Sequence, residues 1–371
     1  MKFNVSSNDL NQGLSAVIGA VPGKATLPIL ETILFECEDG RLKLTATDLE
    51  ISIIEYIDAE IEVEGSVAVP ARRLLDTLRQ LPDIPVYFDI DEKRNVQFRT
   101  DKGNYKLVGE DADEFPGVPD MGEGVTLKTN DDLIHRAIQK TIFAVSNDDL
   151  RPAMMGVFFD IGATESKFVA TDGHRLVKFI SKNLTSAEPL SFIVPEKALN
   201  LVQKAIDGPE CTLTVSNDHA LFSSGKTIII TRLINEQYPN YDSVIPRDND
   251  KTMMVDKNQM LSTVRRVSVF SSTTTRQIRL EMGPDKVTIR AEDLDMSSEA
   301  KETVACEYSN DTMEIGFNAR YLADVLNNVD GDEVKFEFST PNRAGIVKPS
   351  SEEDGEQMLM LVMPVMLNSY A

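Results

Sequence analysis

The chain repeats itself, and this repetition constrains the fold more than any other feature of the sequence. Thr45-Ala46-Thr47-Asp48-Leu49 resembles Val169-Ala170-Thr171-Asp172-Gly173, which follows roughly 120 residues later, and a weaker copy stands at Arg290-Ala291-Glu292-Asp293-Leu294. Each copy closes a strand-like run of alternating apolar and polar residues. A pattern that returns at one long period indicates domains arranged in tandem.

Two further markers return with the same period. Val69-Pro70-Ala71-Arg72 comes back as Val194-Pro195-Glu196-Lys197 and then as Phe317-Asn318-Ala319-Arg320, and Phe115-Pro116 comes back as Tyr238-Pro239. Independent markers that share one period are hard to obtain by chance. They predict three domains, at residues 1–124, 125–248 and 249–371.

Each predicted domain contains two segments with apolar residues at helical spacing. The first segments are residues 8–20, 131–144 and 257–270, and the second are residues 72–81, 197–206 and 320–329. We expect the marker proline in the first helical turn, where its missing N–H needs no partner. Runs such as 86–90, 96–100 and 105–110 alternate like strands with one covered face. The pattern predicts an α+β domain, with two helices on one face of an antiparallel sheet.

The composition favours a cytoplasmic protein. No apolar run approaches the roughly 20 residues that span a bilayer, and residues 1–5 show no export signal. The three cysteines, Cys37, Cys211 and Cys306, lie far apart, which fits neither a disulfide framework nor a zinc site. We therefore expect reduced thiols, no metal, no cofactor and no membrane association.

The formal net charge of −22 disfavours nucleic-acid binding when it is considered alone. The predicted helices are nevertheless less acidic than this balance implies. Their basic residues include Arg72, Arg73, Arg79, Arg136, Lys140, Lys197, Lys204, Lys257, Arg265, Arg266 and Arg320. These residues are either ordinary charged helix surface or the lining of one common positive surface. Because no helix-turn-helix or zinc finger is present, any DNA contact should be to phosphates.

The stretch Ala170–Leu176 has the composition of a small catalytic cluster. Asp172 and His174, with a serine such as Ser146, would form a hydrolytic set, but residues at i and i+2 on a strand end point to opposite sides. No nucleophile elbow or phosphate-binding loop accompanies them. Asp48, Asp172 and Asp293 recur with the repeat, which favours a role in turns. We therefore expect a non-enzymatic protein in which the histidine marks a partner site.

At the level of the whole chain, the sequence resembles the bacterial DNA polymerase III beta subunit family, the sliding clamps that confer processivity. The segments that carry the resemblance are Leu27–Leu30, Thr45–Asp48, Ala170–Leu176, Met313–Asn318 and Val362–Pro364. The resemblance implies three DNA-clamp domains per chain and a head-to-tail homodimeric ring around duplex DNA. The helices would line the hole, and DNA would be held by weak, salt-sensitive phosphate contacts.

The resemblance also implies the site residues. Those expected near DNA are Lys24, Arg72, Lys197 and Lys204. At the ring interface, Val269 and Phe270 would meet Leu74, Leu75, Tyr105 and Leu107, for which ordinary core packing is the alternative. A pocket for partner peptides would be formed by Met154, Thr171, Gly173, His174, Arg175, Leu176, Pro239, Val244, Leu361, Val362, Met363, Pro364, Val365 and Met366.

Some positions depart from the family pattern. Asp148, Pro152 and Ala153 stand where polar and aromatic DNA contacts occur in relatives, and Ser243 and Met366 stand where an arginine occurs. The chain also continues through Asn368–Ala371. The expected partners are the replicative polymerase alpha subunit, an ATP-driven clamp loader, other DNA polymerases and repair proteins. A repeat-built interaction scaffold that does not encircle DNA is the alternative.

Overall fold

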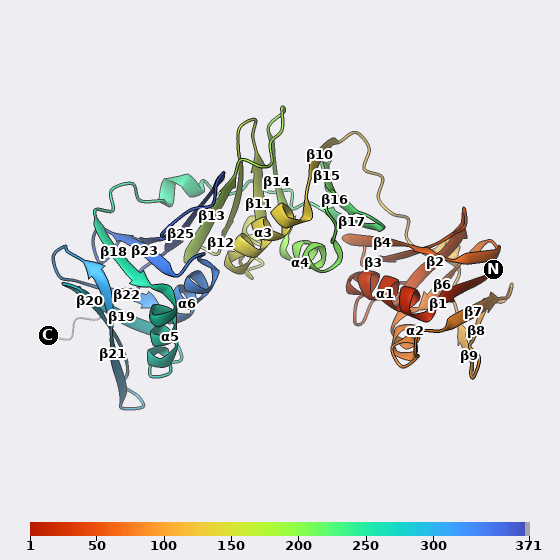
Figure 1. Cartoon of the computed structure of the whole chain (residues 1–371), viewed down its shortest axis with the longest axis horizontal. Helices are drawn as coiled ribbons and strands as arrows, with labels where there is room; N and C mark the ends of the chain where they lie inside the picture. The colour runs from red at the N-terminus through yellow and green to blue at the C-terminus, as the bar shows by residue number, and fades with distance from the viewer. Residues whose placement is uncertain (368–371) are drawn as a thin grey trace. The chain divides into compact units, whose positions relative to one another are not determined.

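The computed structural model describes residues 1–367, and its α-helices, labelled in Figure 1, recur at equivalent positions along the sequence of the three repeats. The bounds of the α-helices are α1 Ser7–Val17, α2 Ala71–Leu78, α3 Asp131–Thr141, α4 Glu196–Ala205, α5 Lys257–Ser268 and α6 Ala319–Asn328. Each falls within or next to a segment predicted from apolar spacing. No helix in the described residues is long and apolar enough to cross a membrane.

The marker prolines lie just before their helices and not in the first helical turn, where we expected them. Pro70 and Pro195 precede α2 and α4 as N-caps with extended backbone, and each also ends a strand, β6 (Gly65–Pro70) or β14 (Leu190–Pro195). Both strands stand at the end of a sheet, where a missing N–H costs no ladder bond. In the third repeat Asn318 takes this place, and its side chain accepts bonds from the Arg320 and Tyr321 amides at 3.0 and 3.4 Å.

The strands form antiparallel sheets that continue from one repeat into the next. A five-stranded sheet has the order β5-β1-β7-β8-β9, an eight-stranded sheet β10-β15-β16-β17-β4-β3-β2-β6, and a twelve-stranded sheet β14-β11-β12-β13-β25-β24-β23-β18-β21-β20-β19-β22. Two pairings cross the joins between repeats: Thr227–Thr231 of β17 with Ile51–Glu55 of β4, and Arg175–Ser181 of β13 with Glu356–Val362 of β25.

The strands of the first repeat are β1 Lys2–Ser6, β2 Thr32–Glu38, β3 Arg41–Thr47, β4 Ile51–Asp58, β5 Glu60–Val63, β6 Gly65–Pro70, β7 Pro85–Ile90, β8 Asn95–Arg99 and β9 Asn104–Val108. Those of the second are β10 Val125–Thr129, β11 Gly156–Ile161, β12 Ser166–Thr171, β13 Arg175–Ser181, β14 Leu190–Pro195, β15 Cys211–Val215, β16 His219–Ser224 and β17 Thr227–Arg232. Those of the third are β18 Lys251–Asp256, β19 Gln277–Gly283, β20 Lys286–Asp293, β21 Ser298–Tyr308, β22 Met313–Asn318, β23 Glu333–Phe338, β24 Gly345–Pro349 and β25 Glu356–Val362.

Contacts within the chain define two compact units that do not coincide with the repeats. The first contains residues 1–135 and 194–233, and the second contains residues 136–193 and the chain from Ile234 onward. The central repeat therefore contributes to both units. All residues that line the hollow described in the next section belong to the second unit.

In the first repeat, α1 and α2 lie side by side and α1 packs on β3 and β4; in the third, α5 and α6 lie side by side and α5 packs on β20 and β21. This confirms the predicted pair of helices on a sheet. Leu74 and Leu75 of α2 are 0% and 2% exposed, so they belong to the core of their own repeat. The prediction that Leu74 and Leu75 lie at the ring interface is therefore wrong, because a fully buried side chain offers no surface to a second chain. The alternative, ordinary core packing, holds for both.

Candidate functional site

The turn after β3 and the turn after β12 are built alike. Oδ1 of Asp48 accepts bonds from the amides of Glu50 and Ile51 at 3.0 and 2.7 Å, and Oδ1 of Asp172 accepts from His174 and Arg175 at 2.9 and 3.0 Å. A side-chain oxygen that binds the amides two and three positions on closes a tight turn. The predicted turn role of these aspartates is therefore confirmed.

The third repeat uses the same device, since Oδ1 of Asp293 accepts from the amides of Asp295 and Met296 at 3.0 and 3.2 Å. In the first two repeats the residue after the aspartate has a left-handed backbone, with φ of 78° at Leu49 and 86° at Gly173. Glycine adopts this conformation without strain. At Gly173 a Cβ would also stand 2.7 Å from Nη1 of Arg151, so this turn is closed against a neighbouring side chain.

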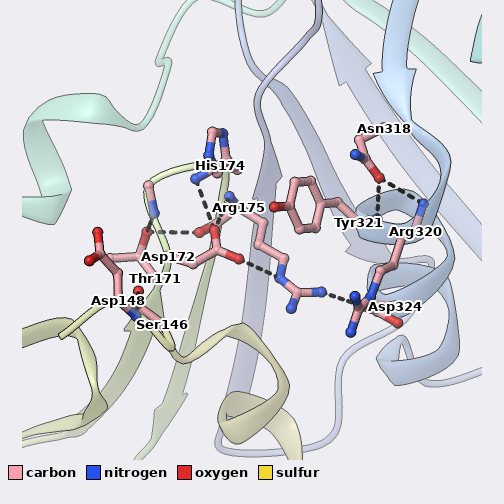
Figure 2. Close-up of polar contacts among 11 residues, drawn as sticks. Ser146, Asp148, Thr171, Asp172, His174, Arg175, Asn318, Arg320, Tyr321 and Asp324 are labelled. Atoms are coloured by element: carbon pink, nitrogen blue, oxygen red, sulfur yellow. Dashed lines mark hydrogen bonds and ion pairs between the residues drawn. The ribbon is translucent and has the colours of Figure 1, made fainter. Parts of the chain in front are cut away.

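Arg175 fastens this turn to α6 of the third repeat, as Figure 2 shows. Its Nε donates to Asp172 at 3.1 Å, its Nη1 donates to Asp324, and its guanidinium lies 5.0 Å from the centre of the Tyr321 ring. Arg175 is only 8% exposed. A buried guanidinium needs such charged partners, and here they come from both repeats.

The same geometry excludes the hydrolytic set. The Asp172 carboxylate is occupied by two backbone amides and by Arg175, while the His174 ring stacks on Tyr321 with ring centres 5.5 Å apart (Figure 2). Ser146 Oγ accepts a bond from the Asp148 amide at 3.1 Å. A triad requires the acid to orient the imidazole and the imidazole to reach the serine, and these bonds direct each group elsewhere.

A hollow of about 410 Å³ opens beside the turn. The predicted pocket residues that line it are Met154, Thr171, Gly173, Arg175, Leu176, Pro239, Val244, Leu361 and Met363. Asn240, Tyr241, Pro246, Asn342, Arg343 and Ala344 also line it and were not predicted. The Tyr-Pro marker leads directly into Asn240-Tyr241, so part of this set had a sequence signal. The segment 342–344, between β23 and β24, had none.

Five predicted pocket residues lie outside the hollow. Val362 is fully buried in the β25 ladder, and His174 lies against Tyr321. Pro364, Val365 and Met366 continue along the C-terminal tail beyond Met363. Asn368–Ala371 lie outside the described residues. The assignment of Val362 as a peptide contact is corrected, because its side chain has no exposed surface.

The floor of the hollow is apolar and rigid. Leu176, Leu361, Val169, Tyr238, Ile193 and Ala344 form one buried cluster beneath it. The Tyr238 hydroxyl donates to the carbonyl of Val169 at 3.3 Å, and burial raises the pKa of Tyr238 above its usual value. Burial likewise raises the pKa of Tyr241 to about 12. Both phenols therefore stay neutral, and the surface remains suited to apolar side chains.

The charged residues that line the hollow are of one sign. Arg175 and Arg343 line it, and none of its lining residues in the described chain is Asp or Glu. Acids outside the lining pair with the nearby cations: Asp248 with Arg343 at 2.5 Å and Asp242 with Lys178 at 3.0 Å. The lining itself is therefore mainly apolar, and the charges of its two arginines are paired with Asp172, Asp324 and Asp248.

Two basic residues of α3 are engaged within the second unit. Arg136 donates to Glu356 and Asp330 at 2.5 and 2.9 Å, and Lys140, which is 6% exposed, donates to Asp330 at 2.5 Å. Glu353 adds a contact to Arg136 at 3.2 Å. These two cations therefore hold α3 to the third repeat, and the acidic segment 349–357 supplies part of the contact.

Burial alone would raise the pKa of Asp330, but the hydrogen bond and charge of Lys140, together with the charge of Arg136, outweigh it. The pKa of Asp330 consequently lies below its usual value. The Asp330 carboxylate is therefore charged at neutral pH.

The residues expected near DNA are exposed, at Lys24, Arg72, Lys197 and Lys204. Arg72 Nη2 donates to the carbonyl of Val21 at 3.4 Å, beside the loop that carries Lys24. Lys197 Nζ pairs with Asp48, although the lysine side chain is 57% exposed. The Asp48 side chain is 13% exposed, so the pair is open to solvent on the lysine side.

In the part of the chain that the structure describes, no group of three or more His, Cys, Asp or Glu residues could hold a metal ion. The cysteines are free and buried. Burial raises the pKa of Cys37 to about 12 and the pKa values of Cys211 and Cys306 to about 11. Their thiols therefore stay protonated and poorly nucleophilic.

Three repeats with two helices each, antiparallel sheets shared between repeats and an apolar hollow in place of a catalytic centre define a three-domain clamp. Family models for the DNA polymerase III beta subunit match each third: the N-terminal domain at residues 1–119, the central domain at 128–240 and the C-terminal domain at 242–364. The chain therefore belongs to the DNA polymerase III beta subunit family, the beta sliding clamps. It is a non-catalytic accessory protein of DNA replication.

Relatives match over nearly their whole length. The beta sliding clamp of Vibrio cholerae is 30% identical over 370 residues, covering 99% of this chain and 100% of the relative. The crystal structure of the Pseudomonas aeruginosa sliding clamp bound to griselimycin is similar with a TM-score of 0.94 at 29% identity, over 99% of this chain and 100% of that one. The Bacillus subtilis sliding clamp has a TM-score of 0.93 at 25% identity, over 99% of both chains.

Proposed function

We propose that two copies of this chain close head to tail around duplex DNA, and that the hollow beside Leu176 receives short peptides of replication and repair proteins. The observation that carries the peptide site is the hollow itself. It is mainly apolar, has no acidic lining residue in the described chain, and borders Gly173–Leu176, where the first repeat has the different residues Leu49–Ser52.

The hollow suits an extended peptide with apolar anchors. Its volume of about 410 Å³ lies within the usual range for binding sites, about 300–1,000 Å³. Met154 and Met363 give it flexible, polarizable walls, which accept more than one side-chain shape. Ser243 and Met366, at positions where relatives carry an arginine, leave Arg343 as a cation of the rim. The partners expected here are the polymerase alpha subunit, the clamp loader, other polymerases and repair proteins.

The DNA contacts would come from Lys24, Arg72, Lys197 and Lys204, whose exposure supports this role. Arg136 and Lys140 would not contact DNA, because they form ion pairs with Asp330, Glu353 and Glu356. Contacts made by a few lysines and arginines to phosphates are weak, depend on salt and do not depend on sequence, as sliding requires. Lys197 would exchange Asp48 for a phosphate when DNA is present.

Two strand edges support the ring interface. β9 is the last strand of the five-stranded sheet, and β21 pairs with β18 only at residues 306–308, so in the described chain its residues 298–305 have a partner strand only in β20. Tyr105 and Leu107 lie on β9, and Val269 and Phe270, 78% and 41% exposed, follow α5 of the third repeat. Addition of one strand edge to another across two chains would cover these edges and apolar side chains together.

Topological retention tests the proposal. The protein, loaded onto closed circular DNA by a clamp loader or from pre-opened rings, is expected to stay on the circle and to leave after the DNA is cut once. Equal loss from the closed and the cut DNA would instead support the interaction scaffold. Light scattering at micromolar concentration measures the mass in solution, and we expect the mass of a dimer. The mass of a monomer would count against the ring. In the cell we expect the protein in the cytoplasm, on the nucleoid during replication.

A further inference from the structure

Gly316 is buried at a strand position where alternation predicts an exposed side chain. Met313, Ile315 and Phe317 of β22 face the core, so Gly316 faces the opposite side together with the exposed Glu314. β22 is also the last strand of the twelve-stranded sheet, which leaves one of its edges without a partner strand. Something outside the sheet therefore covers this glycine.

The cover is the C-terminal tail. Val362 ends the β25 ladder, paired with Arg175 on one side and Gly345 on the other. The Met363 amide then donates to the His174 carbonyl at 2.8 Å, and the Val365 amide donates to the Gly316 carbonyl at 2.9 Å. Val365 and Gly316 form an isolated antiparallel bridge. Within three residues the tail passes from β13 of the central repeat to β22 of the third.

The close approach of the tail requires a glycine. A Cβ at position 316 would stand 2.7 Å from the Val365 carbonyl oxygen, 2.7 Å from Cδ2 of Leu367 and 3.2 Å from Cγ2 of Val365. The leucine side chain is able to rotate away, but the carbonyl oxygen belongs to the backbone. Any residue other than glycine therefore displaces the tail from β22.

We infer that Gly316 is a positioning residue for the peptide site, although it lies outside the hollow. Met363, which is 40% exposed and lines the hollow, stands between the two anchors, the His174 carbonyl and the Gly316 carbonyl. With both bonds made, Met363 and Pro364 have little freedom. With the second bond lost, the tail is held at one end and the methionine wall of the hollow loses its fixed place. This inference rests on the proposed peptide site.

The test compares Gly316→Ala with Gly283→Ala in the full chain. Gly283 ends β19, the neighbouring strand of the same sheet, and a Cβ there would meet nothing closer than Cγ2 of Thr312 at 3.9 Å. The probe is griselimycin, which the Pseudomonas aeruginosa relative binds. We expect Gly316→Ala to bind it about tenfold more weakly, the effect of one lost hydrogen bond with its ordering, and Gly283→Ala to match the wild type. Light scattering is expected to give the same mass for all three proteins.

Hydrogen exchange of the Val365 amide reports the anchor without any ligand. It should be faster in Gly316→Ala than in the wild type or in Gly283→Ala. Unchanged exchange would refute the anchor. Faster exchange with unchanged griselimycin affinity would refute the link from the tail to the hollow.

A chain that ends at Pro364 keeps Gly316 and removes its contact, which covers the case in which Gly316→Ala does not fold. This chain should show the same loss of affinity, and Gly316→Ala should add nothing to it. Wild-type affinity in the shortened chain would overturn the inference. A wild-type protein that does not bind griselimycin would count against the proposed peptide site, whereas the exchange result judges the Gly316 anchor alone.

Discussion

The ion pairs between α3 and the third repeat lead to a quantitative prediction for Asp330→Asn. The asparagine keeps the shape of the side chain but removes the charge that faces Lys140 Nζ at 2.5 Å and Arg136 Nη2 at 2.9 Å. Loss of one partner from a fully buried pair costs about 3–5 kcal/mol, and an exposed pair is worth about 0–1 kcal/mol. Because Lys140 is buried while the Asp330 side chain is 36% exposed, we expect about 2 kcal/mol. In a compact unit of about 150–250 residues, the size class of the second unit, this lowers Tm by about 4–8 °C.

The loss should depend on pH in a defined direction. The pKa of Asp330 is lower in the folded chain than its usual value, about 3.9 in an unfolded chain. Its contribution is therefore complete above about pH 5 and disappears as the pH falls through the lowered pKa. The difference in Tm between the wild type and Asp330→Asn, measured by differential scanning calorimetry, should be largest near pH 7 and shrink below about pH 4.

Asp332→Asn is the matched control, since Asp332 is an exposed acid two positions along the same segment. It removes one negative charge without touching the two cations of α3, and its Tm should stay close to that of the wild type. Equal effects of the two substitutions at pH 7 would refute the reasoning. So would a difference for Asp330→Asn that grows on acidification, because the linkage would then have the opposite sign.

Three other variants test the remaining sites. Leu176→Ala together with removal of residues 365–371 should leave the dimer intact and weaken peptide binding at least tenfold, about 1.4 kcal/mol; unchanged fluorescence anisotropy titrations would argue against the pocket. Arg72→Glu with Lys197→Glu should shorten retention on closed circular DNA at low salt without changing the dimer, and equal retention throughout a salt titration would remove both residues from the DNA surface. Asp324→Asn leaves a buried guanidinium with one carboxylate, so calorimetry should show a loss of about 1–2 kcal/mol, and wild-type stability would contradict the proposed fastening of the turn.

The helices were predictable because the signal for a helix, the spacing of its apolar residues, lies within the segment itself. Each one has apolar residues at helical spacing, as Leu10, Leu14 and Val17 show for α1. The turns after Asp48 and Asp172 were predictable for the same reason, since the side chain and the amides that it binds are two or three positions apart.

The roles of the charged residues were not predictable in this way. Lys140 stands in an amphipathic helix, and its sequence neighbours give no sign that its partner, Asp330, lies 190 residues further along. Leu74 is similar, because a leucine in a core and a leucine in an interface have the same neighbours in sequence. The segment 342–344 reaches the hollow only because β23 and β24 bring it there. The environment of Lys140, of Leu74 and of the segment 342–344 depends on contacts between residues far apart in the sequence. Hydrophobic periodicity carries no information about such contacts.

The passage of the sheets across the joins between repeats has a consequence for the origin of such a chain. β4 and β17, and β13 and β25, belong to different repeats and meet as neighbouring strands. One repeat cut out at its boundaries would expose these strands and would either aggregate or pair with another copy of itself. The chain is in this sense an oligomer of three like subunits whose contacts were made permanent by peptide linkers. A single-repeat ancestor would have needed partners before it had a function, so self-association would have come first and gene fusion afterwards.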